Sequence, residues 1–109
     1  GHFTLGENIA DHGGLRIAYT ALHNTFDGVE PAPIDGFTAD QRFYLAYAAL
    51  WAGNIRDAEI LRLTKIDPHS LGRWRVNAAL RNMETFFKAF DIKEGDAMYM
   101  APEDRVIIW

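Results

Sequence analysis

Two acidic side chains near the N-terminus, Glu7 and Asp11, have the spacing of groups that could serve a metal site. Residues four apart on a helix project from the same face, so one carboxylate could bind an ion while the other supports it. A second explanation needs no metal, because acidic residues near a helix start balance the positive end of the helix dipole and cap free amides. From the spacing alone, the second explanation is favoured.

His69 and Arg75 are the other two side chains that could do chemistry. His69 follows Pro68 in a predicted loop, where a histidine is most often a surface residue or a simple hydrogen-bonding partner. Arg75 follows Trp74, and an arginine in that position is most often a partner in a salt bridge or a stacking contact. Taken alone, neither residue identifies a site.

Several other kinds of site are absent from the sequence. None of the four histidines is followed by Glu, so there is no H-E-x-x-H zinc helix, and no phosphate loop, nucleophile elbow or EF-hand loop occurs. Without cysteine, disulfides and thiolate metal sites are excluded. The net charge of -4 argues against binding of nucleic acid, which needs clustered Lys and Arg. No apolar run reaches the roughly 18 residues of a membrane span.

Length and composition are those of a folded protein or of part of one. The chain has 109 residues, of which 49% are hydrophobic and 24% are charged. These values are ordinary for a globular protein, and the length suits one small domain or a piece of a larger one. We expect a single segment over residues 1–109 that is mainly α-helical, with about four helices and irregular connections.

Capping boxes predict where two of the helices begin. Thr4 and Glu7 fit the Thr-x-x-Glu pattern and place the start of the first helix near Leu5, while Thr38 and Gln41 open the second helix. Apolar residues at spacings of three and four follow each signal. They are Leu15, Ala18, Tyr19, Leu22 and Phe26 in the first helix, and Phe43, Tyr44, Tyr47, Leu50 and Trp51 in the second.

Breaker residues and apolar spacing divide the rest of the chain. The sequence predicts a loop over 28–37 and an end of the second helix at Gly53. A third helix over 56–65 is stopped by Pro68, and an extended or irregular segment over 69–80 follows it. A fourth helix runs from the N-cap Asn82 to Phe90, and a tail covers 95–109. The tail ends in apolar residues, which normally pack against other parts of a protein.

Four segments in the same order resemble the neprilysin and endothelin-converting-enzyme family of zinc metalloendopeptidases. They are Gly6-Glu7-Asn8-Ile9-Ala10-Asp11, Leu50-Trp51-Ala52-Gly53, the run from Asp67-Pro68-His69-Ser70 to Gly72-Arg73-Trp74-Arg75-Val76, and the terminal Trp109. The resemblance covers nearly all of this chain but only the last part of a typical member. It implies the C-terminal portion of a thermolysin-like zinc peptidase catalytic domain.

The resemblance implies a role for each of the four chemical side chains. Glu7 is similar to the third protein ligand of the zinc ion, and Asp11 to the acid that orients a zinc-bound histidine. His69 matches the histidine that stabilises the oxyanion of the reaction intermediate. Arg75 matches the arginine that holds a peptide carbonyl of the substrate.

The resemblance also implies a substrate pocket in this chain and further catalytic residues in the upstream part of the same domain. Leu50 and Trp51 fall where the family lines its pocket for the residue after the scissile bond, and the family cleaves peptides before large apolar residues. The catalytic base and two zinc-ligand histidines would lie upstream of Gly1. We therefore expect the isolated chain to be inactive, to hold zinc only weakly, and to need the upstream part of the same catalytic domain.

Departures from the family pattern bear on the source of the protein. Leu71 stands in place of a proline, which could loosen the loop that holds His69. Ala52 stands where vertebrate members have cysteine, and other cysteines of those members are missing too. The resemblance is thus to a bacterial-type member, which implies a periplasmic, cell-surface or secreted protein.

Two alternatives to a peptidase segment stay open. The chain could be a helical interaction module that keeps the family's motifs without catalysis, or a natural short homologue that acts as a structural partner. Retention of Glu7, Asp11, His69 and Arg75 together favours the peptidase, because a module needs none of them. We also expect a possible homodimer of the isolated chain, because the apolar face of its second helix would lack a cover.

Overall fold

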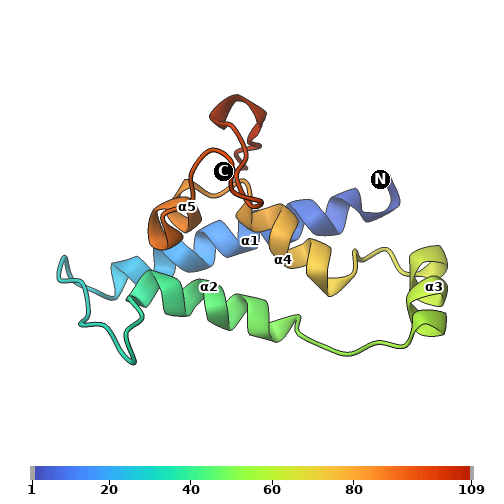
Figure 1. The fold of residues 1–109 in the computed structure, drawn as a ribbon, viewed down its shortest axis with the longest axis horizontal. Helices are drawn as coiled ribbons and strands as arrows, with labels where there is room; N and C mark the ends of the chain where they lie inside the picture. The colour runs from blue at the N-terminus through green and yellow to red at the C-terminus, as the bar shows by residue number, and fades with distance from the viewer. Residues whose placement is uncertain (1, 109) are drawn as a thin grey trace.

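The computed structural model describes residues 2–108, which form five α-helices and one short 3-10 helix (Figure 1). The elements are α1 (His2–Asn24), α2 (Ala39–Leu50), α3 (Asp57–Ile66), α4 (Gly72–Leu80), α5 (Glu84–Phe90) and the 3-10 helix η1 (Pro102–Asp104). The β-type pairing in the described residues is a single isolated bridge between Ile34 and Phe37. The prediction of a mainly α-helical fold is confirmed, with one helix more than expected.

Helices α1 and α2 lie side by side and run in opposite directions (Figure 1). Asp40, at the start of α2, accepts hydrogen bonds from the Tyr19 hydroxyl at 2.8 Å and from Nε2 of His23 at 2.6 Å. Burial of the phenol and its bond to Asp40 raise the pKa of Tyr19. The Tyr19 ring also packs on the rings of Phe43 and Tyr44. These contacts hold α1, which carries Glu7, against α2, whose C-terminal end leads to the predicted pocket residues Leu50 and Trp51.

The observed helix starts confirm one of the two predicted capping boxes. Thr38 caps α2 as predicted, because its side chain accepts from the Gln41 amide and the Gln41 side chain accepts from the Thr38 amide. The predicted start of the first helix near Leu5 is wrong. Helix α1 is already formed at His2, so Thr4 lies inside the helix rather than at its cap.

The segment over 69–80 is not extended or irregular as predicted, because Gly72–Leu80 form α4. Val76, Ala79 and Leu80 are the buried residues of this helix, and their spacing is helical. With only nine residues, α4 is too short for that spacing to stand out in the sequence. The prediction failed because the burial of α4 depends on helices far away in the chain.

The boundaries of α2 and α3 differ little from the predicted ones. Helix α2 ends at Leu50 with Trp51 as its C-cap, before the expected end at Gly53. Helix α3 covers Asp57–Ile66, close to the predicted 56–65.

The hydrophobic core is built from residues of α1, α2, α4 and α5, and its most buried side chain, Tyr44, lies where α2 meets α5. Tyr44 is 1% exposed, its ring packs edge-on against Phe86, and its hydroxyl is hydrogen-bonded to Thr85. Burial raises the pKa of Tyr44 to about 12. We expected the apolar face of α2 to be open to a second copy of the chain, but α5 already covers it at Tyr44. The argument for a homodimer is therefore wrong at Tyr44, and the homodimer itself stays a prediction.

The start of α5 and the tail are joined by Asn82. The prediction that Asn82 is the N-cap of this helix is wrong, because Met83 holds that position. The Asn82 side chain instead accepts a hydrogen bond from the Val106 amide at 2.8 Å. The guanidinium of Arg105 lies 4.2 Å from the ring centroid of Phe87. The tail is thus docked as expected, and Met98, Tyr99 and Met100 pack against the hydrophobic core as well.

Two apolar residues near the end of the tail stay open to solvent, whereas Ile108 is partly buried. Val106 is 57% exposed and Ile107 is 75% exposed. Trp109, which the resemblance matches to the terminal tryptophan of the family, lies outside the residues that the structure describes.

Candidate active site

Glu7 and His69 come together although they are far apart in the sequence. Glu7 lies on α1, and His69 lies in the loop between α3 and α4. Their closest atoms, Oε2 of Glu7 and Nε2 of His69, are 3.2 Å apart, and both side chains are about half-exposed. The structure therefore brings the predicted metal ligand and the predicted oxyanion-stabilising histidine to one open place on the surface.

Asp67 fixes the orientation of His69. Oδ1 of Asp67 accepts hydrogen bonds from the His69 backbone amide at 2.9 Å and from Nδ1 of its ring at 2.6 Å. These two bonds lower the pKa of Asp67, the backbone bond having the larger effect. A carboxylate only accepts, so the hydrogen must be on Nδ1. Nε2 is then the ring nitrogen that faces Glu7.

Arg75 and Asp11 form a nearly buried ion pair between α4 and α1. Nε and Nη2 of Arg75 donate to the two carboxylate oxygens of Asp11 at 2.6 and 2.7 Å, and both side chains are 13% exposed. These hydrogen bonds raise the pKa of Arg75. Bidentate pairs of this kind are among the stronger polar contacts in proteins. Two of the predicted site residues thus bind each other directly.

Trp51 and Tyr47 complete the surroundings of Arg75. The guanidinium carbon of Arg75 lies 3.9 Å from the ring centroid of Trp51, a close cation–π contact. The Tyr47 hydroxyl donates to the backbone carbonyl of Arg75 at 3.2 Å. Burial and the nearby charge of Asp11 raise the pKa of Tyr47, so its hydroxyl stays a donor at neutral pH. The Arg75 side chain is therefore held from α1 and from the end of α2.

The backbones of α2 and α4 touch at Gly72. A Cβ atom added there would lie 2.6 Å from the carbonyl oxygen of Trp51 and 3.2 Å from its Cβ. A backbone oxygen cannot move aside as a flexible side chain can. Gly72 is thus needed to seat the start of α4, and with it Arg75, against Trp51.

Replacing Gly72 by Ala is expected to destabilise the chain by about 1–3 kcal/mol, the usual cost of forcing extra atoms into a packed contact. The measurement is urea unfolding of the purified chain. Gly53→Ala is the matched control, because a Cβ there meets no atom within 4 Å. Equal stability of the two variants would contradict the close approach at Gly72.

A cavity of about 260 Å³ opens beside His69. Its lining comes from the end of α2, the loop after it, α3, the loop between α3 and α4, and the start of α4. The lining residues are Leu50, Trp51, Ala52, Ile55, Leu63, Asp67, His69, Ser70, Leu71, Gly72 and Arg75. Leu50 lies at the rim and is 76% exposed, whereas Trp51 is partly buried. Both predicted pocket residues therefore line one cavity together with His69 and Arg75.

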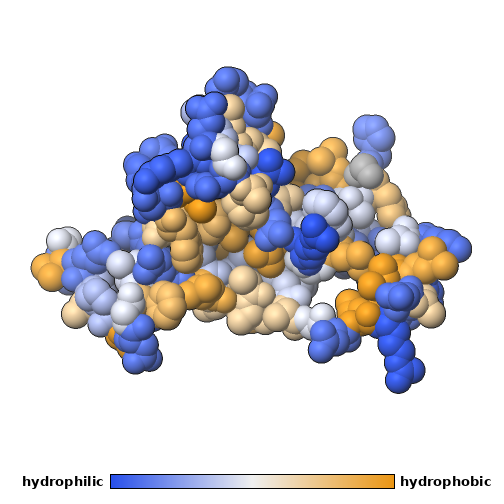
Figure 2. Space-filling model, viewed as in Figure 1, coloured by the Kyte–Doolittle hydropathy of each residue, from blue (hydrophilic) through white to orange (hydrophobic). Residues whose placement is uncertain are grey.

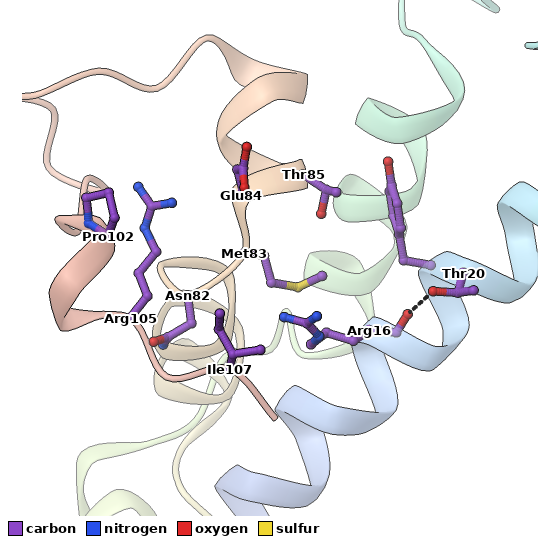
Figure 3. Close-up of a pocket in the computed structure, with 10 residues that line it drawn as sticks. Arg16, Thr20, Asn82, Met83, Glu84, Thr85, Pro102, Arg105 and Ile107 are labelled. Carbon is purple, nitrogen blue, oxygen red and sulfur yellow. Dashed lines mark hydrogen bonds between the residues drawn. The ribbon is translucent and has the colours of Figure 1, made fainter. Parts of the chain in front are cut away.

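A larger cavity of about 410 Å³ lies between α1, the start of α5 and the tail (Figure 3). Figure 3 shows Arg16 reaching into it from α1, with Asn82, Met83 and Ile107 around the guanidinium. None of the predicted site residues lines this cavity, and neither does a histidine. Of these two, the cavity of about 260 Å³ is therefore the better candidate for chemistry.

Glu7 has the residue type and the exposure to supply one ligand of a zinc site. A zinc site takes oxygen from carboxylates and nitrogen from histidines, with at least three protein ligands. Within residues 2–108, no group of three or more His, Asp and Glu side chains is arranged to hold a metal ion. Glu7 is exposed enough to be one ligand, and the other ligands would have to come from outside this chain.

Sequence reasoning assigned no role to three residues of this site. Asp67 orients His69, Gly72 allows α2 and α4 to touch, and Tyr47 binds the backbone of Arg75. The close spacing of Asp67 and His69 was a usable signal, because a carboxylate two residues before a histidine can bond back to it. Nothing in the sequence signalled the two contacts between α2 and α4.

Comparisons with known proteins identify the family of this chain. A family model described as peptidase family M13 matches residues 1–106. The chain is 38% identical over 112 residues to Neprilysin-2 of Caenorhabditis elegans, covering all of this chain and 15% of that protein. It is 37% identical over 112 residues to human Membrane metallo-endopeptidase-like 1, covering all of this chain and 14% of that protein.

A solved structure is similar over the whole chain. The zinc metalloprotease ZMP1 of Mycobacterium tuberculosis in its open state superposes with a TM-score of 0.96 at 43% identity, over 100% of this chain and 17% of that one. The chain thus spans only about a seventh of the curated relatives, 14–15% of their length. The family resemblance predicted from the four segments is confirmed, and the chain belongs to peptidase family M13.

Proposed function

We propose that this chain is the C-terminal segment of the catalytic domain of a zinc metalloendopeptidase. In this proposal Glu7 supplies the third protein ligand of the zinc ion, and the upstream part of the domain supplies two histidines and the catalytic base. The observation that carries the proposal is the approach of Nε2 of His69 to the Glu7 carboxylate, at 3.2 Å. Membership of a peptidase family supports it as well.

The chain's own residues would act on the substrate around the metal. Zinc, when bound, polarises the attacking water and the scissile carbonyl. His69 in its protonated form donates a hydrogen bond from Nε2 to the negatively charged oxygen that forms at that carbonyl. Asp67 holds the imidazole in position for this task through its bond to Nδ1.

Arg75 and the cavity would hold the peptide. The Nε and Nη2 atoms of Arg75 are taken by Asp11, which leaves Nη1 to donate to a peptide carbonyl. Asp11 would thus hold Arg75 in place. Asp11 also lies one helical turn from Glu7, and from there it would orient a zinc-bound histidine. Leu50 and Trp51 would receive the large apolar side chain that follows the scissile bond.

The test is kinetics of His69→Ala in the intact enzyme. Zinc content should not change, and kcat should fall by about 10²–10³-fold, the usual effect of removing one oxyanion donor. Asp67→Asn should lower kcat less, because Nε2 remains present while its orientation is no longer fixed. The measurements are steady-state kinetics and metal analysis of the folded enzyme.

His23→Ala is the matched control, because His23 also binds an aspartate at 2.6 Å but lies away from the cavity. It should lower the melting temperature without changing kcat of the folded fraction. If His69→Ala behaves like His23→Ala, the histidine has only a structural role and the assignment is wrong.

We also propose that the protein works outside the cytoplasm, in the periplasm, at the cell surface or after secretion. The support is the name of one relative, a membrane metallo-endopeptidase-like protein. In the part of the chain that the structure describes, no helix is long and apolar enough to span a membrane. Fractionation of the source cells, with peptidase activity as the readout, tests this proposal.

A further inference from the structure

The residues that line the cavity beside His69 differ in how firmly they are held. Trp51, at the end of α2, is fixed under Arg75 and next to Gly72. Aliphatic side chains from other elements line the cavity as well, among them Ile55, from the loop after α2, and Leu63, from α3. Because Trp51 is held in place, differences in the size of the cavity must come mainly from the other lining side chains.

Helix α3 stands apart from the rest of the molecule and is joined to it by two loops (Figure 1). None of its residues is buried. Hydrophobic residues gather at this end of the molecule (Figure 2). Of the two leucines of the helix, Leu61 is 59% exposed and does not line the cavity, whereas Leu63 is partly buried and does. Leu63 is thus the point at which α3 meets the cavity.

We propose that Leu63 is a specificity-determining residue that sets the size of the apolar side chain accepted after the scissile bond. The inference rests on the proposed function, because it assigns the cavity of about 260 Å³ to the substrate. Leu63 is an apolar residue of the cavity lining, and its backbone carbonyl accepts a hydrogen bond from the Asp67 amide at 2.9 Å. A substitution at Leu63 keeps this backbone group and changes only the side chain, so it changes the room in the cavity.

The experiment compares two peptides that differ only in the residue after the scissile bond, Phe in one and Ala in the other. In the intact enzyme, Leu63→Phe fills the cavity and should lower kcat/KM for the Phe peptide about 10-fold or more while sparing the Ala peptide. Leu63→Ala enlarges the cavity and should shift the ratio of the two values toward the Phe peptide. The change should appear in KM, because contact with an unreacting side chain is the same in substrate and transition state.

Leu61→Phe and Leu61→Ala are the matched controls and should leave the ratio unchanged. If Leu63→Phe does not fold, Leu63→Val together with Leu63→Ala keeps the test open, because the two variants enlarge the cavity in two steps and the ratio should shift with each. A ratio that stays at the wild-type value in both Leu63 variants, with activity retained, overturns this inference alone. A wild-type enzyme that cleaves neither peptide contradicts the proposed function instead.

Discussion

Replacing Glu7 by Gln in the intact enzyme is expected to remove zinc and peptide hydrolysis together. A neutral amide is a poor zinc ligand, and catalytic zinc has three protein ligands, so the loss of one cannot be absorbed by the others. The loss of zinc affinity should exceed the roughly 10–100-fold typical of residues that only orient a ligand. Metal analysis after dialysis and kcat measured at rising zinc concentrations give the result, and excess zinc should restore part of the activity.

Glu84→Gln is the matched control for this change. Glu84 is an exposed glutamate on α5 that pairs with Lys88 and lies away from the cavity beside His69. It should keep full zinc content and activity. Stoichiometric zinc in Glu7→Gln after dialysis would remove Glu7 from the metal site.

Asp11→Asn is expected to destabilise the chain more than any other single change of charge. It leaves the guanidinium of Arg75 nearly buried and without its carboxylate. Breaking a buried ion pair by removing one partner costs roughly 3–5 kcal/mol, because the remaining charge is no longer compensated. Urea unfolding of the purified chain measures this cost as a lower midpoint at unchanged slope.

Two further variants separate this effect from a general loss of charge. Asp91→Asn removes an exposed carboxylate that pairs with Lys93 at 2.6 Å, and exposed pairs contribute about 0–1 kcal/mol. The double variant Asp11→Asn with Arg75→Met should be more stable than Asp11→Asn alone, because no unpaired charge remains. A double variant as unstable as the sum of both single changes would contradict the pairing.

The parts of the fold that were predictable are those set by local chemistry. The start of α2 depends on hydrogen bonds between Thr38 and Gln41, which are near neighbours in the chain. Helix α4 was missed because its burial comes from packing on α1, which no local pattern encodes. The cover over Tyr44 was missed for the same reason, since α5 follows much later in the sequence.

The residues of the candidate site could be selected from the sequence, but their geometry could not. Resemblance to the family selected Glu7 and His69, whose residue types alone favoured ordinary structural roles. That Asp11 binds Arg75 directly could not be read from the sequence, because the pairing requires α1 and α4 to be packed together. The need for Gly72 likewise appears only once α2 and α4 touch.

The most direct test of the account is the position of the zinc ion in the intact enzyme. Anomalous diffraction at the zinc edge, from crystals of that enzyme, locates the ion without reference to the protein coordinates. If Glu7 is the third protein ligand, one of its carboxylate oxygens lies about 2.0–2.2 Å from the ion, the usual zinc–oxygen distance, with His69 and Arg75 nearby but not bound to it. An ion held by other residues, with the Glu7 carboxylate beyond bonding distance, would contradict it.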